Sequence, residues 1–168
     1  VRALDAGGGA RVPTLGEVLD GFGPRIAFNL EIKRARGGLY VGLEAELAAE
    51  LGARGLLDRT LVSSFYDPVL TAWKAASPGA RAGLLISPRY PERAVERARA
   101  AGAEALHPER SLVGRRLVEE AHDAGLAVYV FTVDDSAEMQ RMLELGVEGL
   151  FTNVPARLRR LVDAQRQQ

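Results

Sequence analysis

The sequence of 168 residues contains no cysteine, which excludes a disulfide framework, a thiolate metal site and a cysteine nucleophile. No run of apolar residues approaches the roughly 18 that a membrane-spanning helix needs. Neither sign of charge dominates, because 22 Lys and Arg balance 22 Asp and Glu. A net charge near zero gives no overall electrostatic signature for nucleic acid or for an anionic membrane surface. With 47% apolar residues, the composition is that of an ordinary globular domain.

After residue 24 the sequence repeats one unit, a short apolar run followed by a helical stretch that closes in glycine. Most of the runs are apolar on both faces, as parallel strands buried between two layers should be. We therefore predict strands at residues 25–33, 60–65, 82–87, 104–107, 127–133 and 147–152.

Capping residues, prolines and glycines indicate where the helices between these strands begin and end. Leu43, Leu47 and Leu51 recur every four positions, which is typical of one face of an amphipathic helix. Asp67, Ser111 and either Asp135 or Ser136 are expected to cap the helices that follow them. The predicted helices cover residues 40–51, 67–76, 91–102, 111–125, 135–146 and 155–164.

Strands that alternate with helices predict a parallel α/β sheet with right-handed crossovers. Six units of about 28 residues each suit either a (β/α)₈ barrel or a doubly wound sheet. No glycine-rich fingerprint follows any strand, so a dinucleotide-binding fold has no support. A complete barrel needs roughly 250 residues and eight strands. We therefore predict an α/β fold, an incomplete (β/α)₈ TIM-type barrel, formed by residues 1–168 as one part of a single domain.

The first predicted strand carries the most informative polar residues. Active groups of such barrels lie at the carboxyl ends of the strands. Asn29, Glu31 and Lys33 alternate with apolar residues, so they share one face, which we expect to point into the barrel. Two interpretations remain open here. The pair Glu31 and Lys33 could be an ion pair that holds the barrel mouth, or Glu31 could be an oxygen ligand of a hard cation beside a phosphate-binding Lys33.

Several ordered motifs resemble one family. They are Leu4-Asp5-Ala6-Gly7, Val12-Pro13-Thr14-Leu15, Asn29-Leu30-Glu31-Ile32-Lys33, Val62-Ser63-Ser64-Phe65, His107-Pro108, Phe131-Thr132-Val133, and Gly146 to Asn153 with Pro155. Together they cover essentially the whole chain. The chain resembles the middle and C-terminal parts of a bacterial glycerophosphodiester phosphodiesterase.

The resemblance implies a phospholipase-C-like barrel that hydrolyses glycerophosphodiesters to glycerol 3-phosphate and an alcohol. It also implies a divalent cation, Mg²⁺ or Ca²⁺, held by carboxylates, and two histidines that act as general acid and base. Glu31 corresponds to a metal ligand and Lys33 to a neighbour of the phosphate. Phe65, His107 and Phe131 are expected to line the substrate pocket, with Phe65 against the glycerol.

Departures from the family pattern also matter. The family's His-Arg-Gly, Glu-x-Asp and His-Asp motifs precede the stretch at which this chain starts, so the catalytic histidines have no counterpart and we expect the chain to be inactive alone. Phe131 stands where the family often has Trp, Asp134 where Asn is common, and Asn153 where Asp is frequent. His122 is expected at a helix surface and does not replace the missing pair. Ser63 and Ser64 lack the surroundings of a nucleophile, and we expect them to be wall or structural hydroxyls.

The expected partner is a small glycerophosphodiester, with no nucleic acid and no membrane span. Self-association through the open barrel is a further expectation. An alternative from another class is a non-catalytic barrel fragment that binds a polyol phosphate or a partner chain. We expect a cytoplasmic protein, although a chain starting at Val1 leaves an upstream export signal open.

Overall fold

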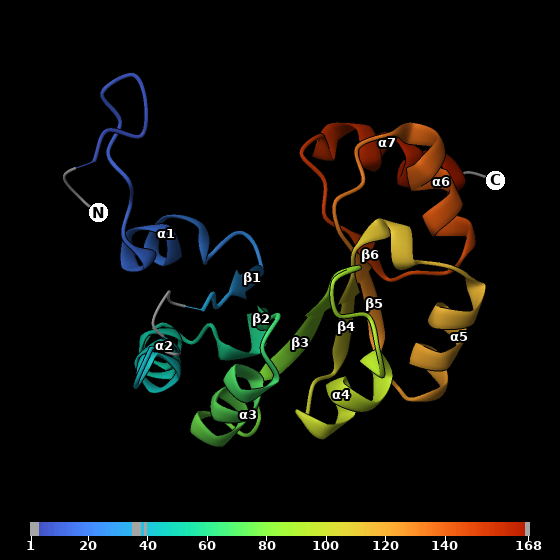
Figure 1. Ribbon diagram of the computed structural model, residues 1–168. Coiled ribbons are helices and arrows are strands. Elements are labelled where there is room, and N and C mark those ends of the chain that lie inside the picture. Colours follow the sequence, from blue (N-terminus) through green and yellow to red (C-terminus); the bar gives the residue numbers. More distant parts are fainter. Residues whose placement is uncertain (1–3, 35–37, 39, 167–168) are drawn as a thin grey trace.

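Six parallel strands follow one another in sequence order to form a single curved sheet. The protein is described by a computed structural model, which covers residues 4–34, 38 and 40–166. The strands are β1 (Phe28–Glu31), β2 (Thr60–Ser64), β3 (Arg81–Ile86), β4 (Ala105–Pro108), β5 (Ala127–Val130) and β6 (Gly149–Leu150). Figure 1 shows them as an arc that has helices on its outer side and a gap between its two ends. The predicted fold, an incomplete (β/α)₈-type barrel, is confirmed.

Each strand lies where the sequence predicted one, but most are shorter. The first was expected over residues 25–33, whereas β1 covers only Phe28–Glu31. Arg25 and Ile26 instead donate their backbone N–H groups to the carbonyl of Phe22, which extends the preceding helix as a turn. At the other end, the Ile32 N–H still donates to the Ser63 carbonyl, so pairing with β2 continues one residue beyond the strand.

Seven α-helices cover the described part of the chain. They are α1 (Leu15–Phe22), α2 (Leu43–Gly52), α3 (Asp67–Ala76), α4 (Ala94–Ala100), α5 (Arg115–Asp123), α6 (Ser136–Glu144) and α7 (Pro155–Gln165). Helix α1 was not among the predicted helices. It begins with a capping box, because the Thr14 hydroxyl accepts from the Glu17 N–H while the Glu17 carboxylate accepts from the Thr14 N–H.

The caps predicted at Asp67 and Ser111 were wrong, and the helices predicted from residues 40 and 91 begin three residues later, at Leu43 and Ala94. Asp67 is not a cap but the first residue of α3, and its carboxylate faces Arg97 of α4. Ser111 lies in a short 3₁₀ turn, and α5 begins after it, at Arg115. At α6 the prediction is confirmed, because the Asp135 carboxylate accepts from the Glu138 N–H at 2.9 Å.

The hydrophobic core lies between the convex side of the sheet and the helices. Trp73 of α3 is fully buried there, and its indole N–H donates to the Arg81 carbonyl at 3.1 Å. Leu47 and Leu51 of α2 are buried as the four-residue spacing predicted. No helix in the described ranges is long and apolar enough to cross a membrane.

Two glutamates repeat one contact at the end of the sheet opposite the barrel mouth. Glu104, just before β4, accepts the backbone N–H of Ala82 in β3 at 2.8 Å. Glu148, just before β6, accepts the backbone N–H of Val128 in β5 at 2.6 Å. A side-chain nitrogen also contacts each carboxylate, and it comes from the helix before the strand whose N–H is bound: Lys74 of α3 in the first case and His122 of α5 in the second. The contacts tie neighbouring strands where they begin.

Candidate functional site

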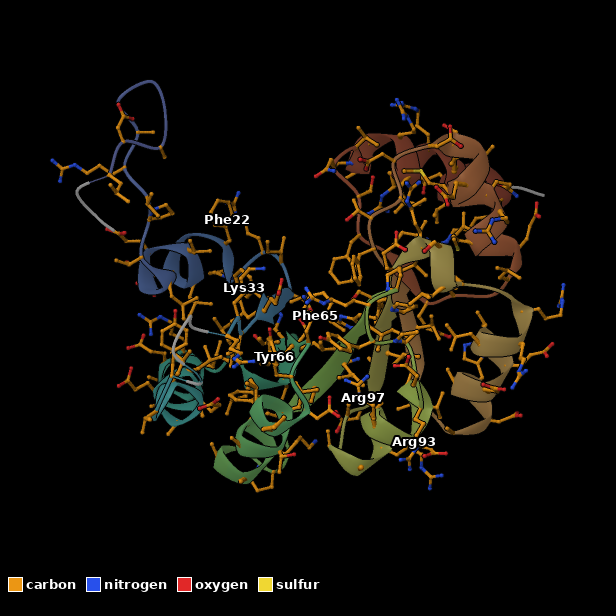
Figure 2. All side chains as sticks on the ribbon, viewed as in Figure 1. Phe22, Lys33, Phe65, Tyr66, Arg93 and Arg97 are labelled. Atoms are coloured by element: carbon orange, nitrogen blue, oxygen red, sulfur yellow. The ribbon has the colours of Figure 1, made fainter. Side chains whose placement is uncertain are left out.

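A hollow of about 340 Å³ lies on the concave side of the sheet, near the carboxyl ends of its strands. The strand ends bring together residues more than a hundred positions apart in sequence. Figure 2 shows Lys33 and Phe65 close together where β1 and β2 end. The residues that line the hollow are Asn29, Glu31, Ser63, Phe65, Leu85, Phe131, Thr132 and Phe151.

The alternation along β1 sets the polar side of the hollow. Phe28 and Leu30 are half-buried against the core and Ile32 is buried, whereas Asn29 and Glu31 are exposed and line the hollow. The prediction that the polar face points inward is confirmed for Asn29 and Glu31. Lys33 follows the end of β1 and lines a groove between β1 and α2 instead.

Glu31 and Lys33 form an ion pair, with Lys33 Nζ donating to Glu31 Oε1 at 2.9 Å. The Lys33 side chain is 76% exposed and the Glu31 side chain 29% exposed. Such an exposed pair typically contributes only about 0–1 kcal/mol to stability. An ion pair that only held the barrel mouth together would therefore contribute little to stability. Both side chains remain accessible to a ligand.

Aromatic rings form the other wall of the hollow. Phe65, just after β2, meets Phe131, just after β5, edge to face with ring centroids 5.9 Å apart. Phe151, which follows β6, lines the same hollow, and all three rings are half-buried. A ligand with one charged end and one carbon-rich end matches this arrangement of a polar side facing an apolar side.

His107 lies deeper than the mouth position that the sequence suggested. It is fully buried, and neither ring nitrogen has a hydrogen-bond partner. The ring packs edge-on against Tyr129 at 5.4 Å and tilted against Phe151 at 5.3 Å between centroids. It lies over Gly83, where a Cβ atom would approach the imidazole Nε2 to 2.6 Å, so glycine makes room for it.

The imidazole borders a second cavity, of about 430 Å³, that extends toward the beginnings of the strands. Burial lowers the pKa of His107 to about 4, because the charged form would lose its water without gaining a partner. His107 is therefore neutral near pH 7, and it separates the mouth from the lower cavity rather than lining the mouth hollow.

The two serines of β2 are structural, as predicted. Ser63 Oγ accepts from Asn29 Nδ2 at 3.1 Å, and Ser64 Oγ donates to the Ile32 carbonyl at 2.8 Å. Both side chains are fully buried. The second bond holds the backbone between Glu31 and Lys33, so the polar pair is attached firmly to β2.

Asp134, for which the sequence predicted no role in the site, lies at the centre of a hydrogen-bond network. Its carboxylate accepts from the Thr152 hydroxyl at 2.9 Å, the Asn153 N–H at 2.8 Å and Asn153 Nδ2 at 2.9 Å. These bonds hold the pKa of Asp134 below its usual value, and the bonds from Asn153 contribute most. Asp134 and Asn153, two of the departures from the family pattern noted above, therefore contact each other. A carboxylate stands where the family commonly has an amide, and an amide stands where it frequently has a carboxylate.

The donor set at the mouth suits a hard cation but is incomplete. Glu31 supplies a carboxylate and Asn29 an amide oxygen, the ligand types that Mg²⁺ and Ca²⁺ prefer. In the described ranges, no group of three His, Cys, Asp or Glu side chains could hold a metal ion. Glu31 can serve as one ligand, and a metal site would need further oxygen donors.

A curled α/β sheet with a carboxylate, a lysine and an aromatic wall at its carboxyl ends defines the class, a TIM-type barrel with a candidate site for a small anionic ligand. The family model of the glycerophosphoryl diester phosphodiesterase family matches residues 2–157. The chain therefore belongs to this family.

Relatives agree with that assignment. A glycerophosphodiester phosphodiesterase of Caldanaerobacter subterraneus subsp. tengcongensis is 32% identical over 175 residues, covering 96% of this chain and 69% of its own length. One from Bacillus subtilis is 30% identical over 159 residues, covering 88% of this chain but only 53% of its own length. A solved phosphodiesterase from Oleispira antarctica, in complex with the product sn-glycerol-3-phosphate, is 25% identical with a TM-score of 0.80. That match covers 92% of this chain and 63% of the solved one, so the chain spans about half to two thirds of these relatives.

Proposed function

We propose that the chain is part of a single glycerophosphodiester phosphodiesterase domain and supplies the phosphate-binding and alcohol-binding side of its active site. The reaction would cleave a glycerophosphodiester with water to give glycerol 3-phosphate and an alcohol. Family membership supports this activity, as does the glycerol phosphate product in the Oleispira antarctica relative. The observation that carries the proposal is that Glu31, which pairs with Lys33, lines one hollow together with Phe65 and Phe131.

Each residue has a distinct role in this proposal. Lys33 holds a phosphate oxygen and offsets the charge that develops in the transition state. Glu31 is one carboxylate ligand of a divalent cation, Mg²⁺ or Ca²⁺, which when bound supplies additional charge stabilisation for the phosphate. Phe65 and Phe131 pack against the carbon atoms of the glycerol or of the leaving alcohol. His107 lies under Phe151 and supports the floor of the hollow.

Water must lose a proton during the reaction and the leaving alkoxide must gain one. The chain has only two histidines. His107 is buried without an accessible nitrogen, and the ring of His122 on α5 faces Glu148 at 3.1 Å. Neither lines the mouth hollow. We therefore propose that the general acid and base come from outside residues 1–168, and that the chain alone is inactive.

The experiment measures hydrolysis of glycerophosphocholine by the full-length protein to which this chain belongs, called the natural protein below. It compares the unchanged protein with the Glu31→Gln variant. Because the amide keeps the shape but loses the anionic oxygen, we expect kcat/KM to fall at least about a hundredfold, or about 2.7 kcal/mol. Calorimetric titration with Mg²⁺ and Ca²⁺ should show weaker binding. Glu119→Gln, on the exposed side of α5, is the matched control and should leave both measurements unchanged. Normal turnover by Glu31→Gln at saturating metal would disprove the ligand assignment.

The non-catalytic alternative, a fragment that binds a polyol phosphate, predicts a different result. It predicts binding of glycerol 3-phosphate without metal-dependent hydrolysis by the natural protein.

A further inference from the structure

The loops around the mouth carry a group of exposed residues that the proposed reaction does not use. The loops after β1, β2 and β3 all lie at the same end of the sheet, because the three strands are parallel. Among the side chains that these loops expose are two arginines, three tyrosines and a valine. We call this group the rim: Arg34, Tyr40, Val41, Tyr66, Arg89 and Tyr90.

The arginines of the rim lie over tyrosine rings. The Arg34 guanidinium lies 5.5 Å from the centroid of the Tyr66 ring, which joins the first loop to the second. Arg89 lies 5.6 Å from the centroid of the Tyr90 ring in the third loop. Neither arginine takes part in an ion pair within the part of the chain that the structure describes. Both therefore place beside an aromatic ring a guanidinium group that has no ion-pair partner among the described residues.

Arg97 connects the loop after β2 to the loop after β3. Arg97 of α4 binds the Asp67 carboxylate with Nη2 at 2.7 Å, and its Nη1 donates to the Tyr90 carbonyl at 3.2 Å. Asp67 directly follows Tyr66, so this arginine fixes the two tyrosine-bearing loops side by side. Figure 2 shows Lys33, Tyr66 and Arg97 in succession along the arc of strands. The rim is thus a built surface that spans three loops.

The apolar members of the rim are unusually exposed. Tyr90 is 61% exposed, Tyr40 52% and Tyr66 37%, and Val41 is fully exposed. Tyr40 lies beside Lys33, because both line the same groove between β1 and α2. Exposed apolar side chains next to these two arginines indicate an interaction surface.

We propose that the rim docks the barrel mouth on the surface of an anionic phospholipid bilayer. Tyrosine rings are suited to the headgroup region, since they have an apolar body and a polar end. The guanidinium groups can bind lipid phosphates through paired hydrogen bonds, and Val41 would enter the acyl boundary. The net charge of zero is that of the whole chain and does not describe this half of the mouth. The acidic residues Asp134 and Asp135 lie in the loop after β5, on the other half.

Nucleic acid is the other polyanion to consider. The exposed Val41 favours a lipid surface, because a bilayer interior accepts an aliphatic side chain and a phosphate backbone does not. The proposal does not depend on hydrolysis, since docking requires the rim and not Glu31 or Lys33.

The experiment measures sedimentation of the full-length natural protein, of which this chain is a part, with vesicles of pure phosphatidylcholine, with vesicles of phosphatidylcholine mixed with phosphatidylglycerol, and without vesicles. We expect binding only to the anionic vesicles, weakened when NaCl rises from about 0.05 to 0.5 M. R34S/R89S should bind about 30-fold more weakly, since each cation near such a surface contributes about 1 kcal/mol. R81S/R99S removes two exposed arginines from the opposite end of the sheet and should bind like the unchanged chain. V41S should weaken vesicle binding severalfold.

Three outcomes would overturn the proposal. One is equal binding to neutral and anionic vesicles, and another is equal loss in R34S/R89S and R81S/R99S. The third is binding to a short DNA duplex that matches vesicle binding and is indifferent to V41S, which would assign the rim to nucleic acid. Circular dichroism of each variant separates a lost surface from a lost fold. Because vesicle binding needs no turnover, failure here and failure of the phosphodiesterase proposal are distinguishable.

Discussion

His107→Leu should remove a pH-dependent cost of folding that arises from one buried imidazole. The ring is fully buried, its nitrogens have no partner, and burial lowers its pKa from 6.5 to about 4. Above pH 6.5 the ring is neutral in both the folded and the unfolded chain, so it contributes no pH dependence there. Below pH 6.5 the imidazole of His107 becomes protonated in the unfolded chain, whereas in the folded chain it stays neutral until the pH approaches about 4.

The size of the effect follows from the two pKa values. A difference of about 2.5 units corresponds to about 3.4 kcal/mol of unfolding free energy. This stability is lost progressively as the pH falls from about 6.5 to about 4, and the loss stops once the folded protein is also protonated. Leucine has no titrating group and leaves no nitrogen unsatisfied, so near pH 7.5 the variant should be about as stable as the original.

Urea unfolding of both proteins between pH 8 and pH 4.5 tests this reasoning. The difference between the two unfolding free energies cancels the other titrating groups and should grow by about 1.4 kcal/mol per pH unit below pH 6. NMR titration of the two histidines, with His107 identified by its absence in the variant, should give a midpoint near 4. Parallel stability curves, or a midpoint above 6, would refute the account of an unpartnered buried ring.

Three further predictions concern the mouth and the edges of the sheet. In the natural protein, Lys33→Arg should lower kcat/KM ten- to a hundredfold, about 1.4–2.8 kcal/mol, because a planar guanidinium replaces a compact charge; unchanged kinetics would make Lys33 structural. Asp134→Ala should lower the melting temperature, because three hydrogen bonds are lost, whereas D134N/N153D should melt near the original by calorimetry; an equal loss in both would refute the exchanged contact. The 168-residue chain should self-associate in analytical ultracentrifugation, because β1 and β6 are open edges in the described sheet and Phe22 and Ile26 are exposed nearby; a monomer with a sharp melting transition would contradict this.

The order and type of the strands could be predicted from the sequence because each strand is a short apolar run with its own boundaries. The inward face of Asn29 and Glu31 could be predicted too, since alternation along a strand is a local property. Lys33 follows the end of β1, so alternation does not determine where its side chain lies. Helix α1 was missed, although Thr14 and Glu17 at capping-box spacing before an apolar run were a readable signal.

The position of His107 could not be predicted from the sequence. Its strand and face were readable, but the direction of its ring depends on Gly83, which belongs to another strand and leaves the space that the imidazole fills. The partner of Asp134 was hidden for a similar reason, because Asn153 is 19 positions away and meets it only where two strand ends converge. Such contacts are consequences of packing and leave no local pattern.

The carboxylates of Glu104 and Glu148 fix the alignment of neighbouring strands where the strands begin. Each one accepts a backbone N–H at the start of a neighbouring strand, at the end of the sheet opposite the mouth hollow. The alignment of strands is therefore secured without help from the loops after β3 and β5. Those loops are free to be exchanged for others of different length or chemistry while the sheet beneath keeps its register. A descendant of this chain could acquire a new ligand by altering loops alone, and the same pair of glutamates would still hold its strands in place.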